Sequence, residues 1–386
     1  MPRPHTQPDV DSRPDPRIDD VVPAAAMPLG EVELTGTNLG PLNFGPPAVL
    51  VDGTPAHVLM SRPTRLIFRV PELASTGLVE VRTPTGVSNS APLRVAHELT
   101  SGLHPVTSPA VSRSGMIYAT ISGERGKQTP VSVVRVSPDG RGTPFVTGIL
   151  NATGLAFNPE GDLFVTSRAE GTVYRVDAAG EFTVYAEGMG VATGAAFDSD
   201  GNLFVGDRSG TIFKINPQRQ IFVHATLEAS VAAYHMAVNA AGTLFVTGPT
   251  LSSNDAIWAI EPNGDTRPWY RGLGRPQGLA LAKDGSIYLA AALHGRRGIV
   301  RVTPQGEATL VLAGVNLVGI AFSPLGTAVL ATNDAVYDVD LSVEGQSPFS
   351  LGAVSLPSPR LEGDKPPEDA SKLEDKARSN KQKNEI

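Results

Sequence analysis

Cysteine is absent from this chain of 386 residues, and charged side chains make up only 18% of it. Without cysteine the protein can form no disulfide, no thiolate nucleophile and no cysteine-ligated zinc site. No segment approaches the run of about 18 apolar residues that a membrane-spanning helix needs. The formal net charge of −7 gives no electrostatic reason to expect nucleic acid or an anionic membrane as a partner.

The first twenty residues, MPRPHTQPDVDSRPDPRIDD, also lack an apolar core resembling a signal peptide. The cytosol is therefore the default expectation, and export stays open because a trimmed start would hide a signal. Residues 1–17 and the charged tail 356–386 have too few apolar side chains to offset the entropy lost on ordering. We expect both ends to be disordered.

Glycine (40) and proline (33) are plentiful, and the glycines belong to a repeat. Its clearest copy is GLAFNPEGDLFVTSRAEGTVYRVDAAGEFTVYAEG, from Gly154 to Gly188, which predicts four short strands separated by turns. The first turn glycine of this unit recurs every 40–46 residues, at Gly115, Gly161, Gly201, Gly242, Gly285 and Gly326. Four strands at this spacing are typical of one β-propeller blade, so the sequence predicts an all-β chain with a six-bladed propeller over 97–355.

Residues 18–96 alternate apolar and polar positions between Gly, Pro and Asp turns, which predicts a small antiparallel sandwich. Three turns, Gly36–Leu39, Val51–Ala56 and Thr85–Pro92, resemble the hallmark turns of the immunoglobulin-like IPT/TIG domain. This resemblance implies a spacer or interaction module. The later units, such as LALAKDGSIYLA, resemble NHL repeats and the propellers of the gluconolactonase and senescence-marker type.

Closure of the ring has two alternatives. The outer strand of the last blade comes either from Ser347–Ala353 or from Ala96–Leu99, which has the right offset from the first copy. The second alternative would tie the sandwich directly to the ring and cover an open sheet edge.

The repeat register places the residues before each inner strand, and the loops between second and third strands, at one mouth of the channel. His235 stands where four copies have glycine and one has serine. It is the candidate catalytic acid or base, and the alternative is a histidine that only fills space.

Ligand-binding candidates surround this mouth. Arg168 and Arg208 occupy matching places in neighbouring copies, where they could clamp a carboxylate. Alternatively they form inter-blade ion pairs, for instance from Asp207 to Arg168. The other ligand-binding candidates are Asp207, Asn151, Gln277 and Asn316.

Two further groups of charges have structural interpretations. The HGRRG loop at 294–298 is interpreted as a solvated tip rather than an anion site. The charged residues that recur at one place in the third strands are interpreted as structural: Arg135, Arg175, Lys214 and Arg301.

The gluconolactonase resemblance implies a calcium or zinc ion held by one Glu, two Asn and one Asp in the channel. Here the four corresponding places contain no carboxylate and read Thr107-Ser108-Pro109, Ala152-Thr153-Gly154, Ala192-Thr193-Gly194 and Pro276-Gln277-Gly278. Asn151, Asn316 and Asp207 do not stand at the matching positions. We therefore expect no metal or other cofactor, and Ca²⁺ or Zn²⁺ only in the case of a hydrolase.

These patterns favour a non-enzymatic binding or scaffolding protein that recognises a peptide, a glycan or a small polar ligand at the propeller mouth. The alternative is a divergent lactonase-like hydrolase, or a lyase, that works in the channel with His235, Arg168, Asp207 and Arg208.

Overall fold

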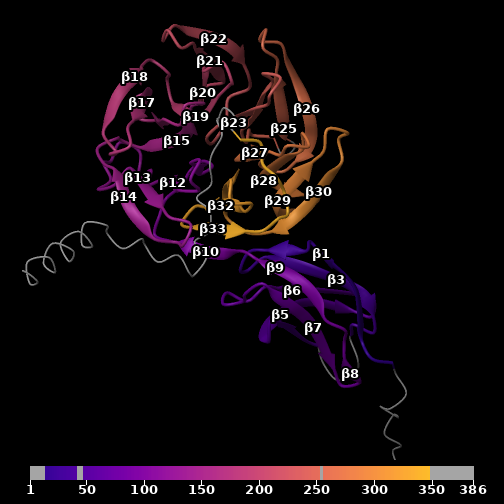
Figure 1. Cartoon of the computed structure of the whole chain (residues 1–386). Coiled ribbons are helices and arrows are strands. Elements are labelled where there is room, and N and C mark those ends of the chain that lie inside the picture. The colour runs from indigo at the N-terminus through magenta and orange to yellow at the C-terminus, as the bar shows by residue number, and fades with distance from the viewer. Residues whose placement is uncertain (1–13, 41–46, 253–254, 348–386) are drawn as a thin grey trace, which may run out of the picture. The chain divides into compact units, whose positions relative to one another are not determined.

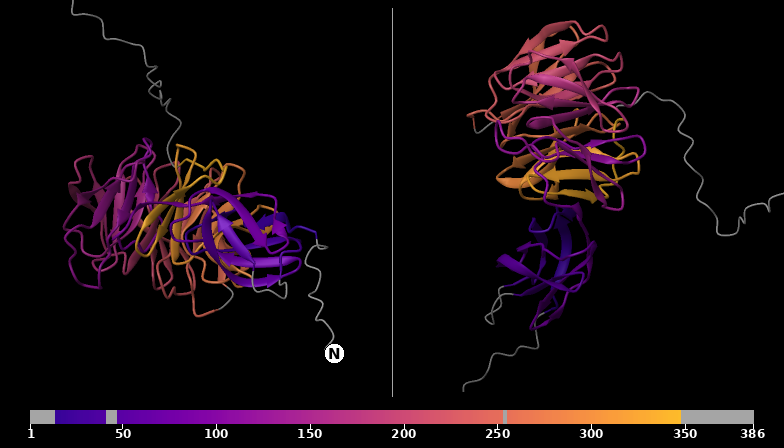
Figure 2. Two further views of the ribbon diagram at one scale, coloured as in Figure 1. Left: turned by 90° about the horizontal axis from the view of Figure 1, so that it is seen from below. Right: turned by 90° about the vertical axis from the view of Figure 1, so that its left-hand side faces the viewer.

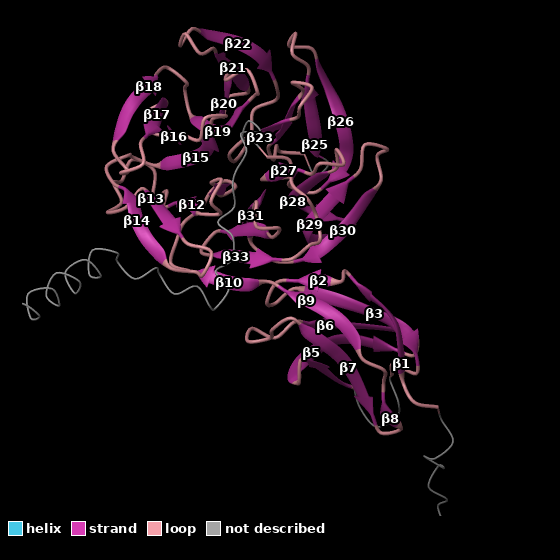
Figure 3. Ribbon diagram, viewed as in Figure 1, coloured by secondary structure: helices cyan, strands magenta, loops and turns pink. Residues whose placement is uncertain are grey.

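The computed structural model describes residues 14–40, 47–252 and 255–347, all within one compact unit, Met1–Ser350. These residues form strands and turns and contain no helix (Figure 3). In particular, no helix among them is long and apolar enough to cross a membrane. The segments 1–13 and 348–386, which include most of the two ends expected to be disordered and the end of the expected propeller range, lie outside the described residues.

The repeats fold into antiparallel four-stranded sheets arranged around a common centre (Figure 1). Five of them are separate sheets: β11 (Ala110–Val111), β12 (Ile117–Thr120), β13 (Val133–Val136) and β14 (Gly142–Val146); β15 (Ala152–Phe157), β16 (Leu163–Ser167), β17 (Thr172–Val176) and β18 (Phe182–Ala186); β19 (Ala192–Phe197), β20 (Leu203–Asp207), β21 (Thr211–Ile215) and β22 (Ile221–Thr226); β23 (His235–Val238), β24 (Leu244–Thr247), β25 (Asp255–Ile260) and β26 (Thr266–Leu273); and β10 (His97–Thr100), β33 (Val336–Val339), β32 (Ala328–Thr332) and β31 (Leu317–Phe322).

The number of separate sheets is five in the described residues, not the six expected from the repeat. The fifth copy, β27 (Leu279–Leu281), β28 (Ile287–Leu293), β29 (Arg296–Val302) and β30 (Ala308–Ala313), is instead part of a 13-stranded sheet. The short strand β2 (Ala25–Ala26) pairs in parallel with the edge of β30, and Met27 N donates to Ala313 O at 2.7 Å. An unpaired outer edge of this copy is thereby covered.

Each repeat uses its first turn glycine in the same way. In all six copies the glycine N–H donates to the carbonyl three residues earlier, and the glycine φ lies between 79° and 102°. Only glycine adopts this left-handed conformation without strain, which explains the spacing seen in the sequence.

The inner strands β11, β15, β19, β23, β27 and β31 contact one another in chain order, and β31 contacts β11. Their glycines are required by this close approach. A Cβ added at Gly154 would lie 2.1 Å from Thr193 O, and one at Gly278 would lie 2.4 Å from the Cα of Gly319. The hub therefore excludes side chains at most of its positions.

The sheet of the last copy closes with an N-terminal strand. β10 pairs with β33, joining His97 to Asp338 and Glu98 to Tyr337, whose hydroxyl donates to the Glu98 carboxylate at 2.9 Å. Of the two alternatives left open by the sequence, the observed strand corresponds to Ala96–Leu99, shifted by one residue. The other candidate, Ser347–Ala353, lies outside the described residues except for Ser347.

The repeated charges of the third strands are structural, as expected. Arg175 and Arg301 each pair with an aspartate of the first turn, Asp162 at 2.7 Å and Asp284 at 2.8 Å. In two other copies the cation lies over an aromatic ring of its own sheet: Arg135 over Phe145 and Lys214 over Phe204.

The remaining strands of the 13-stranded sheet come from the first part of the chain: β1 (Arg17–Val22), β3 (Glu31–Thr37), β4 (Ala48–Val51), β5 (Thr54–Arg62), β6 (Arg65–Arg69), β7 (Gly77–Thr83), β8 (Gly86–Val87) and β9 (Ala91–Val95). Alternate residues of β3, β4 and β6 are buried, as the period of two predicts. They pack into one core that includes Leu34, Val51, Phe68 and Val81. In the strand order these strands join the repeats through β2, which pairs with the outer strand β30 of the fifth copy. Figure 2 shows the indigo strands of this first part in two further views.

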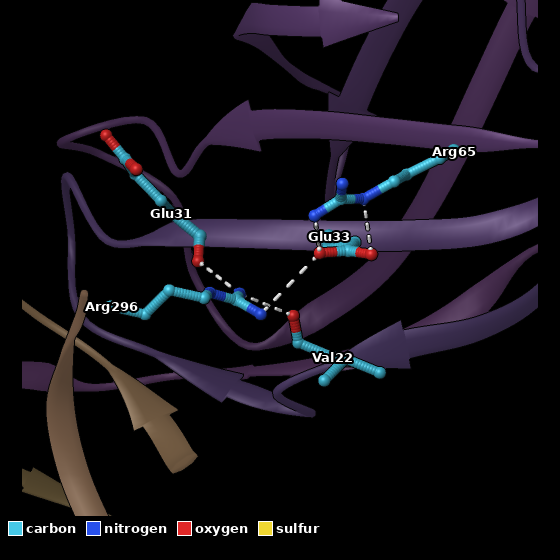
Figure 4. A network of polar contacts seen from close by, with 5 residues as sticks. All are labelled: Val22, Glu31, Glu33, Arg65 and Arg296. Carbon is cyan, nitrogen blue, oxygen red and sulfur yellow. Dashed lines mark hydrogen bonds and ion pairs between the residues drawn. The ribbon is translucent and has the colours of Figure 1, made fainter. Parts of the chain in front are cut away.

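The HGRRG loop is exposed at His294, Gly295 and Arg297, as expected of a solvated tip, but Arg296 binds the N-terminal strands (Figure 4). Its Nη2 donates to Val22 O at 2.9 Å and to Glu31 O at 3.1 Å, and its Nη1 lies 3.7 Å from Glu33 Oε2. Glu33 also accepts two bonds from Arg65, at 2.7 and 2.8 Å. These bonds, with help from the Arg296 charge, lower the pKa of Glu33 below its ordinary value.

Candidate functional site

A cavity of about 390 Å³ opens where the inner strands begin. Four arginines line it, each from a different loop: Arg125 between β12 and β13, Arg168 after β16, Arg208 after β20, and Arg275 before β27. Among the residues that the structure describes, no aspartate or glutamate lines this cavity. The arrangement is a concentration of positive charge in a chain whose net charge is −7.

Arg168 is the most enclosed of the four. Its Nη2 donates to Gly123 O at 3.0 Å, while its buried Nε has no hydrogen-bond partner. Loss of solvation, together with the nearby charges of Arg125 and Arg208, lowers the pKa of the Arg168 guanidinium below its ordinary value. No carboxylate in the part of the chain that the structure describes forms an ion pair with it. A half-buried cation among like charges needs an anion from elsewhere.

Asp207, a predicted ligand-binding residue, organises a turn instead of pairing with Arg168. It is buried, and its Oδ1 accepts from Val191 N at 2.8 Å while Ser209 Oγ donates to its Oδ2. The inter-blade ion pair weighed as an alternative is therefore not among the ion pairs of the described residues. The neighbouring Arg208 donates from Nε to Ser230 O at 3.2 Å and is otherwise exposed.

Asn151, another predicted ligand-binding residue, has its side-chain amide occupied by the protein. It is 1% exposed; its Oδ1 accepts from Gly126 N at 2.6 Å, and its Nδ2 donates to Ser122 O and Glu124 O at 2.5 and 2.8 Å. Two of these bonds hold Glu124 and Gly126, the residues directly before and after Arg125 in its loop. Asn151 therefore acts on the cavity by holding the loop that carries an arginine.

Gln277 and Asn316 lie in a second cavity of about 600 Å³ that adjoins the first. The two cavities share Arg275, Gln277 and Asn333 as lining residues, so they adjoin each other, and together they are called the depression. Arg297 lines the second cavity, and no aspartate or glutamate within 14–40, 47–252 and 255–347 does.

His235, the predicted catalytic residue, is the first residue of β23 and is 4% exposed. It lines neither of the two arginine-containing cavities. Burial lowers the pKa of its imidazole to about 3. The histidine is therefore neutral at ordinary pH and contributes no lining to the arginine-containing cavities.

The far part of the channel is apolar. A cavity of about 180 Å³ is lined there by residues such as Leu155, Phe157 and Phe322. The chain crosses it at Gln346, whose backbone N donates to Leu281 O at 2.7 Å and whose Nε2 donates to Val238 O at 3.1 Å. The arginine end therefore offers a polar ligand more charged side chains than this end does.

The side chains at the mouth do not fit a hard metal ion, which needs several converging carboxylate or carbonyl oxygens. Within the described ranges no three His, Asp or Glu residues gather into a group that could hold a metal. The hydroxyl of Thr107 donates to Thr153 O at 2.7 Å and that of Thr153 to Asn151 O at 2.8 Å, so both serve the protein itself.

Sequence reasoning named the loops of this site but not all of its charges. Arg125 and Arg275 were missed, although each stands in a segment that the register places at the mouth. The signal that could have found them is one arginine in each of several rim loops, which becomes visible only when copies of unequal length are compared.

No protein-family model matches the sequence, and no curated protein matches it. Solved structures do resemble the fold. One is a protein described as a gluconolactonase (18% identity, 65% of this chain and 93% of that one, TM-score 0.54). Two others are a gluconolactonase from Xanthomonas campestris (13%, 77% and 97%, 0.53) and a luciferin-regenerating enzyme (12%, 66% and 97%, 0.53). At these identities the likeness establishes the propeller-like arrangement alone.

Proposed function

We propose that the chain is a non-enzymatic binding protein that recognises a small anionic ligand at the arginine-lined mouth of its propeller. The observation that carries this proposal is the convergence of Arg125, Arg168, Arg208 and Arg275 on one cavity without a lining carboxylate. Guanidinium groups bind carboxylate and phosphate through charge-assisted, often bidentate hydrogen bonds. Of the three ligand classes weighed from the sequence, a small polar molecule suits a cavity of about 390 Å³ best.

The hydrolytic alternative has less support. Its candidate base, His235, is buried outside the arginine cavity with a pKa of about 3, far below the range useful for general-base catalysis near neutral pH. The rim also offers no converging carboxylates for a calcium or zinc ion. A turnover assay therefore accompanies the binding assay below.

The architecture proposed for this function is a six-bladed propeller over 97–355, in which β27–β30 is the blade that also pairs with β2. The six inner strands in cyclic contact support this count. Residues 18–96 are proposed to be an IPT/TIG-like sandwich that serves as a spacer or interaction module. Two features support this proposal. The strands of this segment share one buried core, and the segment contains the turns Gly36–Leu39, Val51–Ala56 and Thr85–Pro92.

Calorimetric titration of the whole protein with phosphate and with citrate tests the proposal. The wild type should bind, with an affinity that falls as salt is raised, and Arg208→Met should bind about tenfold more weakly or worse. The matched control is Arg141→Met, which removes an exposed arginine that lines none of the three cavities described above. Equal loss in the control, or hydrolysis of sugar lactones that a chelator abolishes, would overturn the proposal.

A further inference from the structure

The two adjoining cavities suggest more about the ligand than its sign of charge. Arg125, Arg168 and Arg208 line only the first cavity, Arg297 lines only the second, and Arg275 lines both. Positive charge therefore lies in each of two adjoining cavities, with volumes of about 390 and 600 Å³. That is the size range of sites for small organic ligands.

Arg297 points into this depression for a simple geometric reason. It follows Arg296 in β29, and consecutive residues of a strand face opposite sides. Arg296 faces the N-terminal strands and is held there by Val22 O, Glu31 O and Glu33 (Figure 4). Arg297 is exposed, and none of the ion pairs found among the described residues involves it.

The uncharged lining residues of the second cavity suit an uncharged, hydrogen-bonding body. Gln277, Asn316 and Asn333 offer side-chain amides, and the wall beside them consists largely of small residues such as Ala290–Ala292 and Gly295. An elongated molecule can lie against such a wall without displacing large side chains.

The depression also has a limit. Asn316 and Asn333 border a third cavity of about 470 Å³, and this one is lined by Glu72, Glu98 and Asp334. A long polyanion that continued past the two asparagines would meet these carboxylates and be repelled. The arginine-lined cavities are therefore bordered by carboxylates on the side of these asparagines, which disfavours a charged polymer.

We propose that the ligand is a short molecule with two anionic groups, one held by Arg125, Arg168 and Arg208 and the other by Arg297. This inference rests on the proposed anion-binding function and specifies its ligand class. Phosphate and carboxylate share the required chemistry, so either can supply the anionic groups.

The test uses methylphosphonate as the one-headed probe and a series of alkane-α,ω-bisphosphonates of increasing length as two-headed probes, titrated into the whole protein. Dicarboxylates of matching lengths distinguish the two kinds of anionic group. We expect an optimum length at which the bisphosphonate binds at least tenfold more tightly than methylphosphonate. Long-chain polyphosphate, compared per bound molecule, should bind no more tightly than that optimum.

Variants assign the two ends. Arg297→Met should remove the advantage of the best bisphosphonate, a loss of about tenfold, and leave methylphosphonate binding unchanged. Arg168→Met should weaken both probes, and Arg141→Met neither. If methylphosphonate binds but no bisphosphonate binds more tightly, or if Arg297→Met weakens both probes equally, the two-headed ligand is refuted while anion binding stands. If neither probe binds, the proposed function fails and this inference fails with it.

Discussion

Replacing Arg168 by methionine separates binding from folding. Methionine keeps an unbranched apolar side chain of similar reach and removes only the guanidinium. The substitution loses the hydrogen bond from Nη2 to Gly123 O, 3.0 Å long, which contributes about 1 kcal/mol to stability. It also removes the buried Nε that has no hydrogen-bond partner, and it removes the repulsion between the Arg168 charge and those of Arg125 and Arg208. Since those two partners are exposed and screened by solvent, the relief is of similar size, about 1 kcal/mol.

The two effects offset each other, so the free energy of unfolding should change by less than about 1 kcal/mol, with the melting temperature shifting by about 2 °C at most. Binding should behave differently. Loss of a charged donor to a phosphate or carboxylate costs about 1.5–3 kcal/mol, roughly a ten- to hundredfold loss of affinity. In urea unfolding with and without phosphate, ligand should therefore stabilise the wild type and not the variant.

The opposite pattern would refute this reasoning. If Arg168 is an inter-strand tie whose anion is supplied by the protein, its loss leaves a buried charge unpaired and costs about 3 kcal/mol or more. A variant that is destabilised to that degree, yet binds phosphate as tightly as the wild type does, would make Arg168 a structural residue.

Three further predictions concern the fold. Gly154→Ala places a Cβ 2.1 Å from a neighbouring carbonyl oxygen and should lower the free energy of unfolding in urea by about 3 kcal/mol. In the control Gly142→Ala the Cβ lies 3.2 Å from a threonine hydroxyl, so the loss of free energy should be less than about 1 kcal/mol. Similar losses in the two variants would contradict the close approach of the inner strands. Because Arg65 lowers the pKa of Glu33 below 4.5, this pair stabilises the fold above that pH and the effect is lost as pH falls through the lowered value. Glu33→Gln should therefore cost about 1 kcal/mol at pH 7 and less at pH 3, and an unchanged difference would refute the pairing. His235 has a pKa of about 3 when buried, against 6.5 when exposed, so the unfolded chain binds the proton first as pH falls. The free energy of unfolding should therefore fall by about 1.4 kcal/mol for each pH unit below 6.5. His235→Gln should flatten this slope, and equal slopes for the two proteins between about pH 7 and 5 would contradict a buried, neutral His235.

The sequence predicts the repeats well because backbone sterics enforce them. Gly161 and its equivalents need positive φ, and Gly154 needs the absence of a Cβ, so both leave a mark at regular intervals. The predicted number of separate sheets was wrong because the strand that changes it leaves no regular pattern in the sequence. Strand β2 is only Ala25–Ala26 and pairs in parallel with residues far away in the chain. Two residues carry no periodicity, so nothing in the sequence indicates that they extend the sheet of β27–β30.

The candidate site was predictable in part. Arg168 and Arg208 were expected together from their matching places, and both line one cavity. Asn151 could not be distinguished from a ligand residue by type and position, because its role depends on three backbone partners in another loop. Arg296 and Arg297 are neighbours with the same side chain, and only the strand they belong to decides that one binds the N-terminal strands and the other faces a cavity.

The geometry of the hub explains why the binding chemistry has to come from loops. Because backbones of neighbouring inner strands approach too closely for a Cβ at Gly154 or Gly278, the axis itself can hold few functional side chains. His235 is an exception, and its imidazole is buried and kept neutral rather than presented to solvent. The loops have no such restriction, and each of several copies can contribute one long side chain to a common depression. Ligand charge and spacing should therefore change when rim arginines such as Arg208 and Arg297 are moved between copies, while the ring that carries them stays the same.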